Sequence, residues 1–355
     1  MNPVRLAVLG TANIARKNIR AIGEAAGIVV TAVGSRNPEK AKTYCQEVAL
    51  PPSTICCSYK EALANPDIDA VYLPLPTALH LEWVSLAAAA GKHILCEKPV
   101  AVDPAELKTI ESAASSVVLM DGVMFMHNER LSSIRSSLQG GRVGKAGARH
   151  VSSCFTFRGS ASFFAENIRV KKAGDPLGCL GDLGWYNIRV SLAAFDWAMP
   201  SRASGTIASQ TDEGVPLSMS ASLRWDDGRT ATFTCSFTHA LQQWCRIAGD
   251  DAVIAMDDFV IPHHPTTSKF KIVSEDFAEE AAFCRRHEEE VVIEGGKPQE
   301  VLMWEAFAAR VQEAKTSGEV PKPSLTYEAM TQLVTDAVLR SARSGGAEVD
   351  VAQAL

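Results

Sequence analysis

Two kinds of hydrophobic pattern follow one another along the chain. In the N-terminal third, short uninterrupted apolar runs alternate with stretches whose apolar positions recur every three or four residues. Uninterrupted runs are typical of strands buried on both faces, and the longer spacing is typical of helices with one buried face. The runs lie at residues 5–9, 29–33, 70–73, 93–95 and 117–120, and the helical patterns at 14–25, 38–47, 80–90 and 104–114. This alternation predicts a doubly wound α/β domain with a parallel sheet.

The pattern changes after Asp121 and Gly122. Apolar and polar positions now alternate, which is typical of antiparallel strands with one exposed face. These stretches lie at residues 149–157, 218–225, 230–237 and 244–248, and the turn Asp226-Asp227-Gly228 predicts a hairpin between two of them. Helices are expected at 129–138, 181–195, 300–315 and 327–343, and a soft tail from 341–346. We therefore predict a second, α+β domain with a mostly antiparallel sheet.

The bulk properties exclude several classes of protein. The 355 residues are 46% hydrophobic and 21% charged, with a net charge of −6. This length predicts two domains, and the acidic balance argues against nucleic-acid and anionic-membrane partners. No apolar run approaches the ~20 residues that span a bilayer. Nine cysteines without a C-x-x-C pair, and a first strand that begins at Val4 and leaves no room for a signal peptide, predict a reduced, cytoplasmic protein.

A turn that contains glycine and alanine joins the first strand to the first helix. It fits the pattern G-x-[G/A]-x-x-[G/A], which brings a pyrophosphate close to backbone N–H groups at a helix N-terminus. Its residues are Gly10, Thr11, Ala12, Asn13, Ile14 and Ala15. The strand before it and the helix after it are the context that this motif requires. We predict a dinucleotide site here; the alternative is an ordinary strand–helix turn.

The residues after the second strand indicate which nicotinamide cofactor is bound. An NAD site usually has Asp or Glu there, whereas this chain has Ser35 and Arg36, with Lys40 one turn later. Ser35 can donate to a 2′-phosphate, and Arg36 can pair with its charge while it stacks on adenine. NADP is therefore predicted. NAD remains the alternative, because Asn37 and Glu39 could hold its ribose.

Two more segments follow strands of the predicted parallel sheet. Pro74, Leu75 and Pro76 form a stiff loop that we expect near the cofactor, with His80 capping or lining it. Glu97-Lys98-Pro99 follows the run at 93–95 and brings a lysine to the edge where open α/β sheets bind ligands. We expect Glu97 to contact the nicotinamide ribose or to fix the turn.

Asp182 and Tyr186 lie one helical turn apart in the predicted helix 181–195. Oxidation of an alcohol needs a group that accepts the hydroxyl proton while hydride leaves. Tyrosine becomes a better base beside an ammonium group, which Lys98 would supply. We predict Tyr186 as acid/base, Lys98 as its electrostatic partner and Asp182 as the residue that orients Lys98 or a substrate hydroxyl. The alternative is that Lys98 carries the proton and Tyr186 only binds.

The turn Gly10–Ala15, the string Glu97-Lys98-Pro99 and the pattern Asp182-x-Gly184-x-Tyr186 together resemble the Gfo/Idh/MocA oxidoreductases, over essentially the whole chain. Most of that family has histidine at the last position. Tyrosine there resembles the subgroup of glucose–fructose oxidoreductase, NADP-dependent D-xylose dehydrogenase and dimeric dihydrodiol dehydrogenase.

The resemblance implies a domain organisation and an activity. It implies a dinucleotide-binding Rossmann domain at 1–123, a substrate-binding and oligomerisation domain with an open-faced sheet at 124–299, and C-terminal helices at 300–355 that pack back near the domain interface. It implies NADP-dependent hydride transfer to or from a sugar or cyclic polyol. A dihydrodiol or other non-sugar diol or carbonyl is the alternative substrate. A catalytically idle nucleotide-binding regulator and redox-assisted glycoside cleavage are alternatives of other classes.

Further residues are candidates for the substrate pocket or for assembly. His127 and Asn128 follow the last strand of the first domain, and Arg169 precedes the catalytic helix, where it could clamp substrate hydroxyls. Trp185 is expected in the core, because it points about 100° away from its neighbour on a helix. No metal site is evident. We expect the sheet face of 218–237 to be apolar enough to pair with a second copy as a dimer or dimer of dimers.

Overall fold

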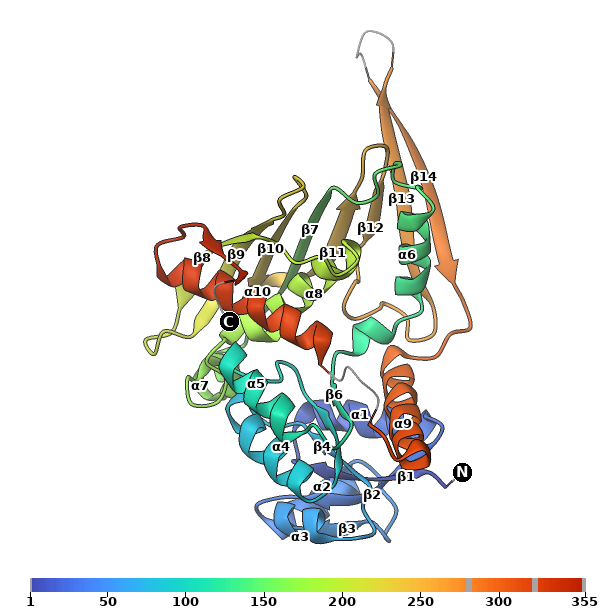
Figure 1. The fold of residues 1–355 in the computed structure, drawn as a ribbon, viewed down its shortest axis with the longest axis vertical. Helices are drawn as coiled ribbons and strands as arrows, with labels where there is room; N and C mark the ends of the chain where they lie inside the picture. The colour runs from blue at the N-terminus through green and yellow to red at the C-terminus, as the bar shows by residue number, and fades with distance from the viewer. Residues whose placement is uncertain (1, 279–282, 321–324, 353–355) are drawn as a thin grey trace. The chain divides into compact units, whose positions relative to one another are not determined.

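The apolar runs of the N-terminal third form a six-stranded parallel sheet, as predicted (Figure 1). The computed structural model describes residues 2–278, 283–320 and 325–352. The strands are β1 (Val4–Leu9), β2 (Ile28–Gly34), β3 (Ile55–Cys57), β4 (Ala70–Leu73), β5 (His93–Cys96) and β6 (Leu119–Asp121). Their order in the sheet is β3-β2-β1-β4-β5-β6. The order reverses between β1 and β4, and open α/β sheets bind ligands at such a reversal.

Helices cover both faces of this sheet, as the uninterrupted apolar strands require. They are α1 (Asn13–Glu24), α2 (Pro38–Glu47), α3 (Tyr59–Ala64), α4 (His80–Ala89), α5 (Pro104–Ala113) and α9 (Gln299–Ser317), with short turns η1 (Thr77–Leu79) and η2 (Met124–His127). One apolar core joins the sheet to α1, α2 and α9. The other joins it to α3, α4 and α5. The Rossmann fold expected for the first domain is therefore confirmed.

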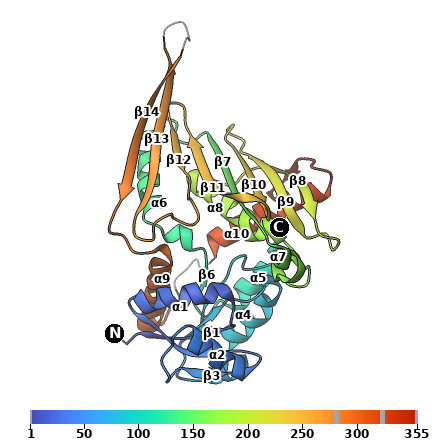
Figure 2. The ribbon, with the colours of Figure 1, turned by 180° about the vertical axis from the view of Figure 1, so that it is seen from behind.

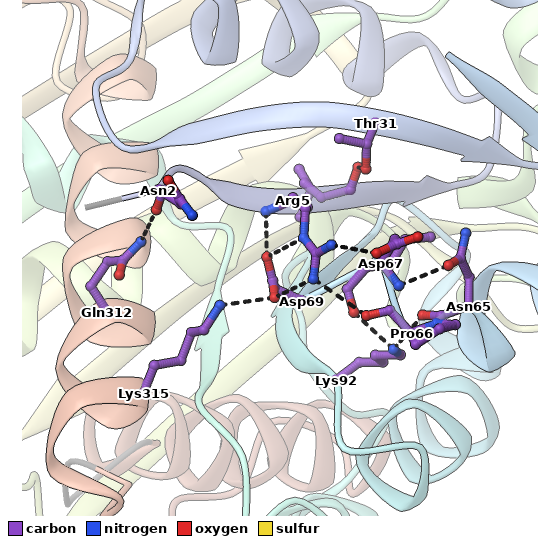
Figure 3. Close-up of polar contacts among 12 residues, drawn as sticks. Asn2, Arg5, Thr31, Asn65, Pro66, Asp67, Asp69, Lys92, Gln312 and Lys315 are labelled. Atoms are coloured by element: carbon purple, nitrogen blue, oxygen red, sulfur yellow. Dashed lines mark hydrogen bonds and ion pairs between the residues drawn. The ribbon is translucent and has the colours of Figure 1, made fainter. Parts of the chain in front are cut away.

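The chain divides into two units, and each contains a separate part of the C-terminus. Unit 1 is Met1–His127 with Pro298–Ala329, and unit 2 is Asn128–Lys297 with Met330–Leu355. Polar contacts attach α9 to unit 1: Lys315 reaches Asp69 at 2.9 Å, and Gln312 donates to the backbone oxygen of Asn2 at 2.7 Å (Figure 3). Helix α9 is therefore part of the Rossmann unit, although the unit 2 segment Asn128–Lys297 precedes it in sequence.

Unit 2 is built on a nine-stranded sheet (Figure 2). The order is β14-β13-β12-β11-β7-β10-β9-β8-β15, and its pairs are antiparallel except β7 with β10. The strands are β7 (His150–Arg158), β8 (Arg202–Gln210), β9 (Pro216–Arg224), β10 (Thr230–Ser236), β11 (Thr238–Ala248), β12 (Val253–Met256), β13 (Ser268–Phe277), β14 (Cys284–Ile293) and β15 (Val349–Asp350). The expected hairpin turn lies between β9 and β10. The mostly antiparallel second sheet is confirmed.

The helices of unit 2 contain the predicted Asp182 and Tyr186. They are α6 (Arg130–Gln139), α7 (Ala161–Glu166), the short turn η3 (Ile168–Val170), the π-helical turn η4 (Leu180–Gly184), α8 (Trp185–Ala194) and most of α10 (Thr326–Arg343). Helix α8 packs on β7 and β10. Asp182 lies in the π-helical turn and Tyr186 in the first turn of α8. A π-helical turn of this kind is often found at a functional site.

Two expectations about unit 2 are wrong. The outward positions of β9 and β10 are hydroxyl side chains, including Ser220, Ser222 and Thr232, so this sheet face is polar and not apolar. Residues 341–346 do not start a soft tail: Ser341 is fully buried, and the chain continues into β15, which pairs with β8. On β9 and β10 the period of two places these serines and threonines together on one side of the sheet.

Candidate active site and cofactor site

The turn between β1 and α1 has the backbone geometry of a phosphate-binding loop. Gly10 has φ +138°, a conformation that residues with a side chain rarely adopt. A Cβ at Gly10 would lie 3.4 Å from Leu75 and 3.5 Å from Pro74, so the structure brings these predicted cofactor residues together. Among the described residues, no side chain caps the N-terminus of α1 and no acidic residue lies in its first turn. The backbone N–H groups there suit an anionic ligand.

Tyr44 of α2 supports this turn. Its hydroxyl donates to the backbone oxygen of Ala12 at 3.2 Å. Burial raises the pKa of Tyr44 to about 12, so the hydroxyl keeps its proton and remains a donor. The guanidinium of Arg16 lies 4.9 Å from the centre of the Tyr44 ring. The turn is therefore held from the neighbouring helix as well as from β1.

The end of β2 places Ser35 where a serine can donate to a ligand. Ser35 is buried, and its oxygen accepts from the backbone N–H of Asn37 at 3.2 Å. That bond uses a lone pair and leaves the hydroxyl hydrogen available to donate. Arg36 and Lys40 are exposed beside it, and Asn37 caps α2 through the N–H groups of residues 39 and 40. Ser35, Arg36 and Lys40 fit a phosphorylated ribose. The side chain of Asn37 is used to cap α2.

His80 joins the two loops at the carboxyl ends of β4 and β5. Its Nδ1 lies 3.0 Å from the oxygen of Pro99 and 3.2 Å from that of Val100, and its Nε2 lies 3.0 Å from the oxygen of Leu75. The ring is fully buried. Burial lowers the pKa of His80, and the nearby carbonyl oxygens act against that shift. His80 therefore links the Leu75 loop to the segment that follows Lys98.

Glu97 has a defined environment at the end of β5. Its backbone N–H donates to Leu73 at 3.2 Å, and its carboxylate accepts from the hydroxyl of Tyr72. A Cβ on Gly122 would lie 3.1 Å from the carboxylate, so glycine leaves the space that Glu97 occupies. Lys98 is half-buried, and the Lys98–Pro99 bond is cis.

Asp182 is paired with Arg169 inside unit 2. The Arg169 Nε lies 3.1 Å from Asp182 Oδ1, and the Asp182 side chain is 14% exposed. The backbone N–H of Arg169 donates to the side chain of Asn167 at 3.0 Å, which fixes the short turn η3. The two candidates named from sequence are therefore brought together, as an ion pair with one largely buried partner.

Tyr186 lies one turn after Asp182 and is buried. Its ring meets the edge of Phe155 on β7, with ring centres 5.6 Å apart. Trp185 is fully buried, as expected for a core residue, and lies beside the guanidinium of Arg189. Asn128 accepts from the backbone N–H of Arg130 at 3.0 Å, and His127 is the last residue of unit 1 before it. Lys98 belongs to unit 1, and Asp182 and Tyr186 belong to unit 2.

Sequence reasoning missed the buried polar residues behind Glu97. Tyr72, Asn18 and Trp304 are almost inaccessible and joined by hydrogen bonds. A signal was available, because a tyrosine in the uninterrupted apolar run 70–73 must find a partner for its hydroxyl. Among the described residues, no group of three His, Cys, Asp or Glu side chains could hold a metal ion. All nine cysteines are free thiols.

Both parts of the chain match known protein families. Residues 4–123 match an oxidoreductase family with an NAD-binding Rossmann fold, and residues 132–255 match the Gfo/Idh/MocA C-terminal domain. The chain belongs to the Gfo/Idh/MocA oxidoreductase family. The resemblance inferred from Gly10–Ala15, Glu97-Lys98-Pro99 and Asp182–Tyr186 is thereby confirmed, and the chain is an oxidoreductase.

Relatives in the Gfo/Idh/MocA family include enzymes of known activity. The chain is 30% identical to a D-xylose 1-dehydrogenase (NADP(+)) of Haloferax volcanii, over 96% of this chain and 98% of the relative. It is 26% identical to the human trans-1,2-dihydrobenzene-1,2-diol dehydrogenase, over 64% of this chain and 66% of the relative. A solved structure, the 3-ketoreductase of Actinomadura kijaniata in complex with NADP and TDP-benzene, superposes with a TM-score of 0.82 at 27% identity, covering 96% of this chain and 98% of that one.

No helix in the described ranges is both long and apolar enough to cross a membrane.

Proposed function

We propose that this member of the Gfo/Idh/MocA family is an NADP-dependent oxidoreductase that moves a hydride between nicotinamide and a sugar, such as a pentose or hexose, or a cyclic polyol. The observation that carries the proposal is the Asp182–Arg169 ion pair, one helical turn before the buried phenol of Tyr186. A carboxylate held in a fixed direction, next to a phenol, suits a substrate with adjacent hydroxyl groups. The NADP-dependent xylose dehydrogenase relative supports the same substrate class.

NADP, when bound, accepts or supplies the hydride. In our proposal Tyr186 takes the proton of the reacting hydroxyl during oxidation and returns it during reduction. Lys98, from unit 1, acts on the same substrate oxygen as a positive charge that favours the phenolate of Tyr186. Asp182 orients Lys98 or a second substrate hydroxyl. The alternative assignment, with Lys98 as the proton carrier, predicts that loss of Lys98 costs more activity than loss of Tyr186.

We assign the NADP site to the turn Gly10–Ile14, the loop Pro74–Pro76 and the end of β2. Gly10 and Leu75 lie together, and Ser35 has a hydroxyl hydrogen available for a 2′-phosphate. Arg36 and Lys40 add positive charge there. Glu97 is assigned to the nicotinamide ribose, and His127, Asn128 and Arg169 to substrate binding. The family's NAD-binding fold over residues 4–123 and the NADP in the 3-ketoreductase structure support an NADP site in unit 1.

A substrate screen with two variants tests the function. Purified protein is mixed with NADP⁺ and a panel of pentoses, hexoses, cyclic polyols and trans-diols, and reduction is followed at 340 nm. We expect turnover of an aldose or polyol, and a loss of about 10²–10⁴-fold in kcat for Tyr186→Phe and Lys98→Met. The exposed residues Tyr327 and Lys108 supply matched controls, Tyr327→Phe and Lys108→Met. Turnover of the diols alone would favour the dihydrodiol substrate.

NADP binding without turnover of any compound in the panel would contradict the proposal and favour an idle nucleotide-binding protein. Undiminished turnover by Tyr186→Phe and Lys98→Met would show that another site performs the chemistry. Glycoside cleavage without net reduction of NADP⁺ would indicate the redox-assisted hydrolase.

We also propose a homodimer, or a dimer of dimers, through the sheet of unit 2. The outward face of β7 to β10 has a hollow of about 390 Å³ lined mainly by serine and threonine side chains. Hydroxyl groups on a sheet face can form hydrogen bonds to the same face of a second copy. We expect light scattering at micromolar concentration to give twice the chain mass or a multiple of it, and Thr232→Arg to lower it. Ser116→Arg, in unit 1, is the matched control; a monomeric wild type would overturn the dimer.

A further inference from the structure

A buried chain of hydrogen bonds leads to the Glu97 carboxylate from three separate parts of the sequence. Trp304 Nε1 on α9 donates to Asn18 Oδ1 on α1 at 2.8 Å. Asn18 Nδ2 donates to the hydroxyl of Tyr72 on β4 at 2.8 Å. The hydroxyl of Tyr72 donates to Glu97 at the end of β5. Trp304 and Tyr72 are fully buried and Asn18 is 2% exposed, so water cannot replace these bonds.

The direction of every bond in this chain is fixed by the tryptophan. An indole N–H can only donate, so the side-chain oxygen of Asn18 must face Trp304. The NH₂ group of Asn18 must then face Tyr72, and it also donates to the backbone oxygen of Ile14 at 3.3 Å. The Tyr72 oxygen therefore accepts from Asn18, and its own hydrogen must point at Glu97. A polarised series of bonds of this kind strengthens its last member.

The same series of hydrogen bonds connects the cofactor turn with the segment that contains Lys98. Asn18 lies on α1, which begins directly after the turn Gly10–Ala12, and Glu97 precedes Lys98. Burial and the neighbouring Glu97 raise the pKa of Tyr72 well above its ordinary value, so its hydroxyl remains a donor. Gly122 also lies beside the carboxylate, since a Cβ there would be 3.1 Å from it.

We propose that Tyr72 is a positioning residue that holds the Glu97 carboxylate as an oriented anion for the nicotinamide half of the cofactor, and that Asn18 and Trp304 set the direction of its hydrogen bond. This inference rests on the assignment of Glu97 to the nicotinamide ribose. It adds a positioning group that acts through Glu97 and contacts no reacting atom.

A double-mutant cycle tests whether Tyr72 acts through Glu97. NADPH affinity is measured by fluorescence titration for wild type, Tyr72→Phe, Glu97→Gln and the double variant. A hydrogen bond to a charged group is worth enough that we expect Tyr72→Phe to weaken binding about ten-fold or more. In the Glu97→Gln background the same change should have little further effect, because the partner charge is already gone. Equal effects of Tyr72→Phe in both backgrounds would overturn the inference.

An isosteric variant tests the direction of the bonds. Asn18→Asp keeps the acceptor for Trp304, but an ionised Asp at this position would force the Tyr72 hydrogen away from Glu97. A buried carboxyl titrates at raised pH, and its protonated form restores the donor. We therefore expect the NADPH affinity of Asn18→Asp to fall further below that of wild type at pH 8.5 than at pH 6. A ratio that does not change with pH would refute the proposed direction.

Two controls separate this inference from the proposed function and from general damage to the fold. Thr31→Val removes a half-buried hydroxyl on β2 that donates to the backbone oxygen of Leu6 at 3.3 Å, and should leave NADPH affinity and its pH dependence unchanged. Wild type that binds no NADPH would contradict the proposed function. In that case the same four proteins are compared by the urea concentration at the midpoint of unfolding. Additive changes of the midpoint for Tyr72→Phe and Glu97→Gln would overturn the inference, and coupled changes would support it.

Discussion

Among single residues, Arg169 has the most direct predicted effect on activity apart from Tyr186 and Lys98. Its guanidinium neutralises Asp182, which is 14% exposed and cannot be fully solvated if that partner is removed. Arg169→Met should lower kcat/KM by about ten-fold or more, because a charged hydrogen bond is lost and Asp182 is no longer held in one direction. Steady-state kinetics on whichever substrate the screen identifies provides the measurement.

Arg135 offers a matched control in the same unit. It pairs with Asp196 at 2.9 Å, but both side chains are more than 60% exposed. Exposed pairs of this kind contribute little, so Arg135→Met should leave kcat/KM within about two-fold of wild type. A loss of activity as large as that of Arg169→Met would mean that removal of any arginine from unit 2 is harmful, and that the Asp182 pair has no special role.

At the scale of the elements, the approach of the chain to α8 depends on Gly178. Gly178 has φ +53°, and a Cβ there would lie 2.2 Å from the backbone oxygen of Pro216 on β9. Gly178→Ala must push the segment before η4 away from the sheet. We expect a loss of roughly 3 kcal/mol or more in the free energy of unfolding, measured by urea denaturation, because a rigid backbone atom is in the way.

Gly23 supplies the opposite case. It lies inside α1, and a Cβ there would have no described atom within 4 Å. Gly23→Ala should therefore stabilise the protein by about 0.5–1 kcal/mol, since alanine loses less backbone entropy in a helix. If Gly178→Ala changed stability no more than Gly23→Ala, close contact with β9 would not be what requires the glycine.

The elements predicted from sequence are those whose burial alone gives a clear pattern. The strands of the Rossmann sheet are buried on both faces and appear as uninterrupted apolar runs, and α6 and α8 lie close to their expected positions. The edge strand β3 was missed because it has three residues and one exposed position. Strand β8 was missed because Arg202–Gln210 contains mostly small and polar residues and has no clear apolar pattern. It forms a strand because it pairs with β9, which its own sequence does not reveal.

The charged segment that includes 287–290 shows the same limit. A run of charged residues is typical of a solvated face, and residues 287–290 are exposed. They nevertheless form strand β14, in which Glu288 and Glu290 pair with Lys271 and Lys269 of β13. Cross-strand charge pairs can stabilise a strand that buries little apolar surface, and this depends on a partner that the local sequence does not reveal.

The candidate site was predictable where one short motif contains the chemistry. Gly10, Glu97, Lys98, Asp182 and Tyr186 each belong to such a motif. The series of hydrogen bonds from Trp304 to Glu97 was not predictable. Trp304 and Asn18 lie 286 residues apart in sequence, and neither residue stands out from the segment that surrounds it. Only the folded unit shows that a C-terminal helix and the first helix share a hydrogen bond behind β4.

At the scale of the whole molecule, the return of α9 to unit 1 depends on charge as well as on apolar packing. Asp69 accepts from the backbone N–H of Arg5 at 2.8 Å, from the Arg5 guanidinium at 3.1 Å, and from Lys315 of α9 at 2.9 Å (Figure 3). Burial alone would raise the pKa of Asp69, but the hydrogen bonds from Arg5 and Lys315 outweigh it and hold the pKa well below its ordinary value. This carboxylate therefore stabilises unit 1 in its ionised form.

The depressed pKa of Asp69 gives a stability prediction with a definite sign. In the unfolded chain Asp titrates near 3.9, so the stabilising effect is complete above that pH and is lost as the pH falls through the lower folded-state pKa. Asp69→Asn should lower the free energy of unfolding by about 1–2 kcal/mol at pH 7, and the difference from wild type should narrow steadily below about pH 4. Asp67 also pairs with Arg5, but its side chain is 81% exposed. Asp67→Asn should therefore lower the free energy of unfolding by less than about 0.5 kcal/mol throughout this pH range. Urea denaturation between pH 3 and pH 7 provides the measurement. A constant difference between Asp69→Asn and wild type over that range would mean that the charge of Asp69 does not hold α9 in place.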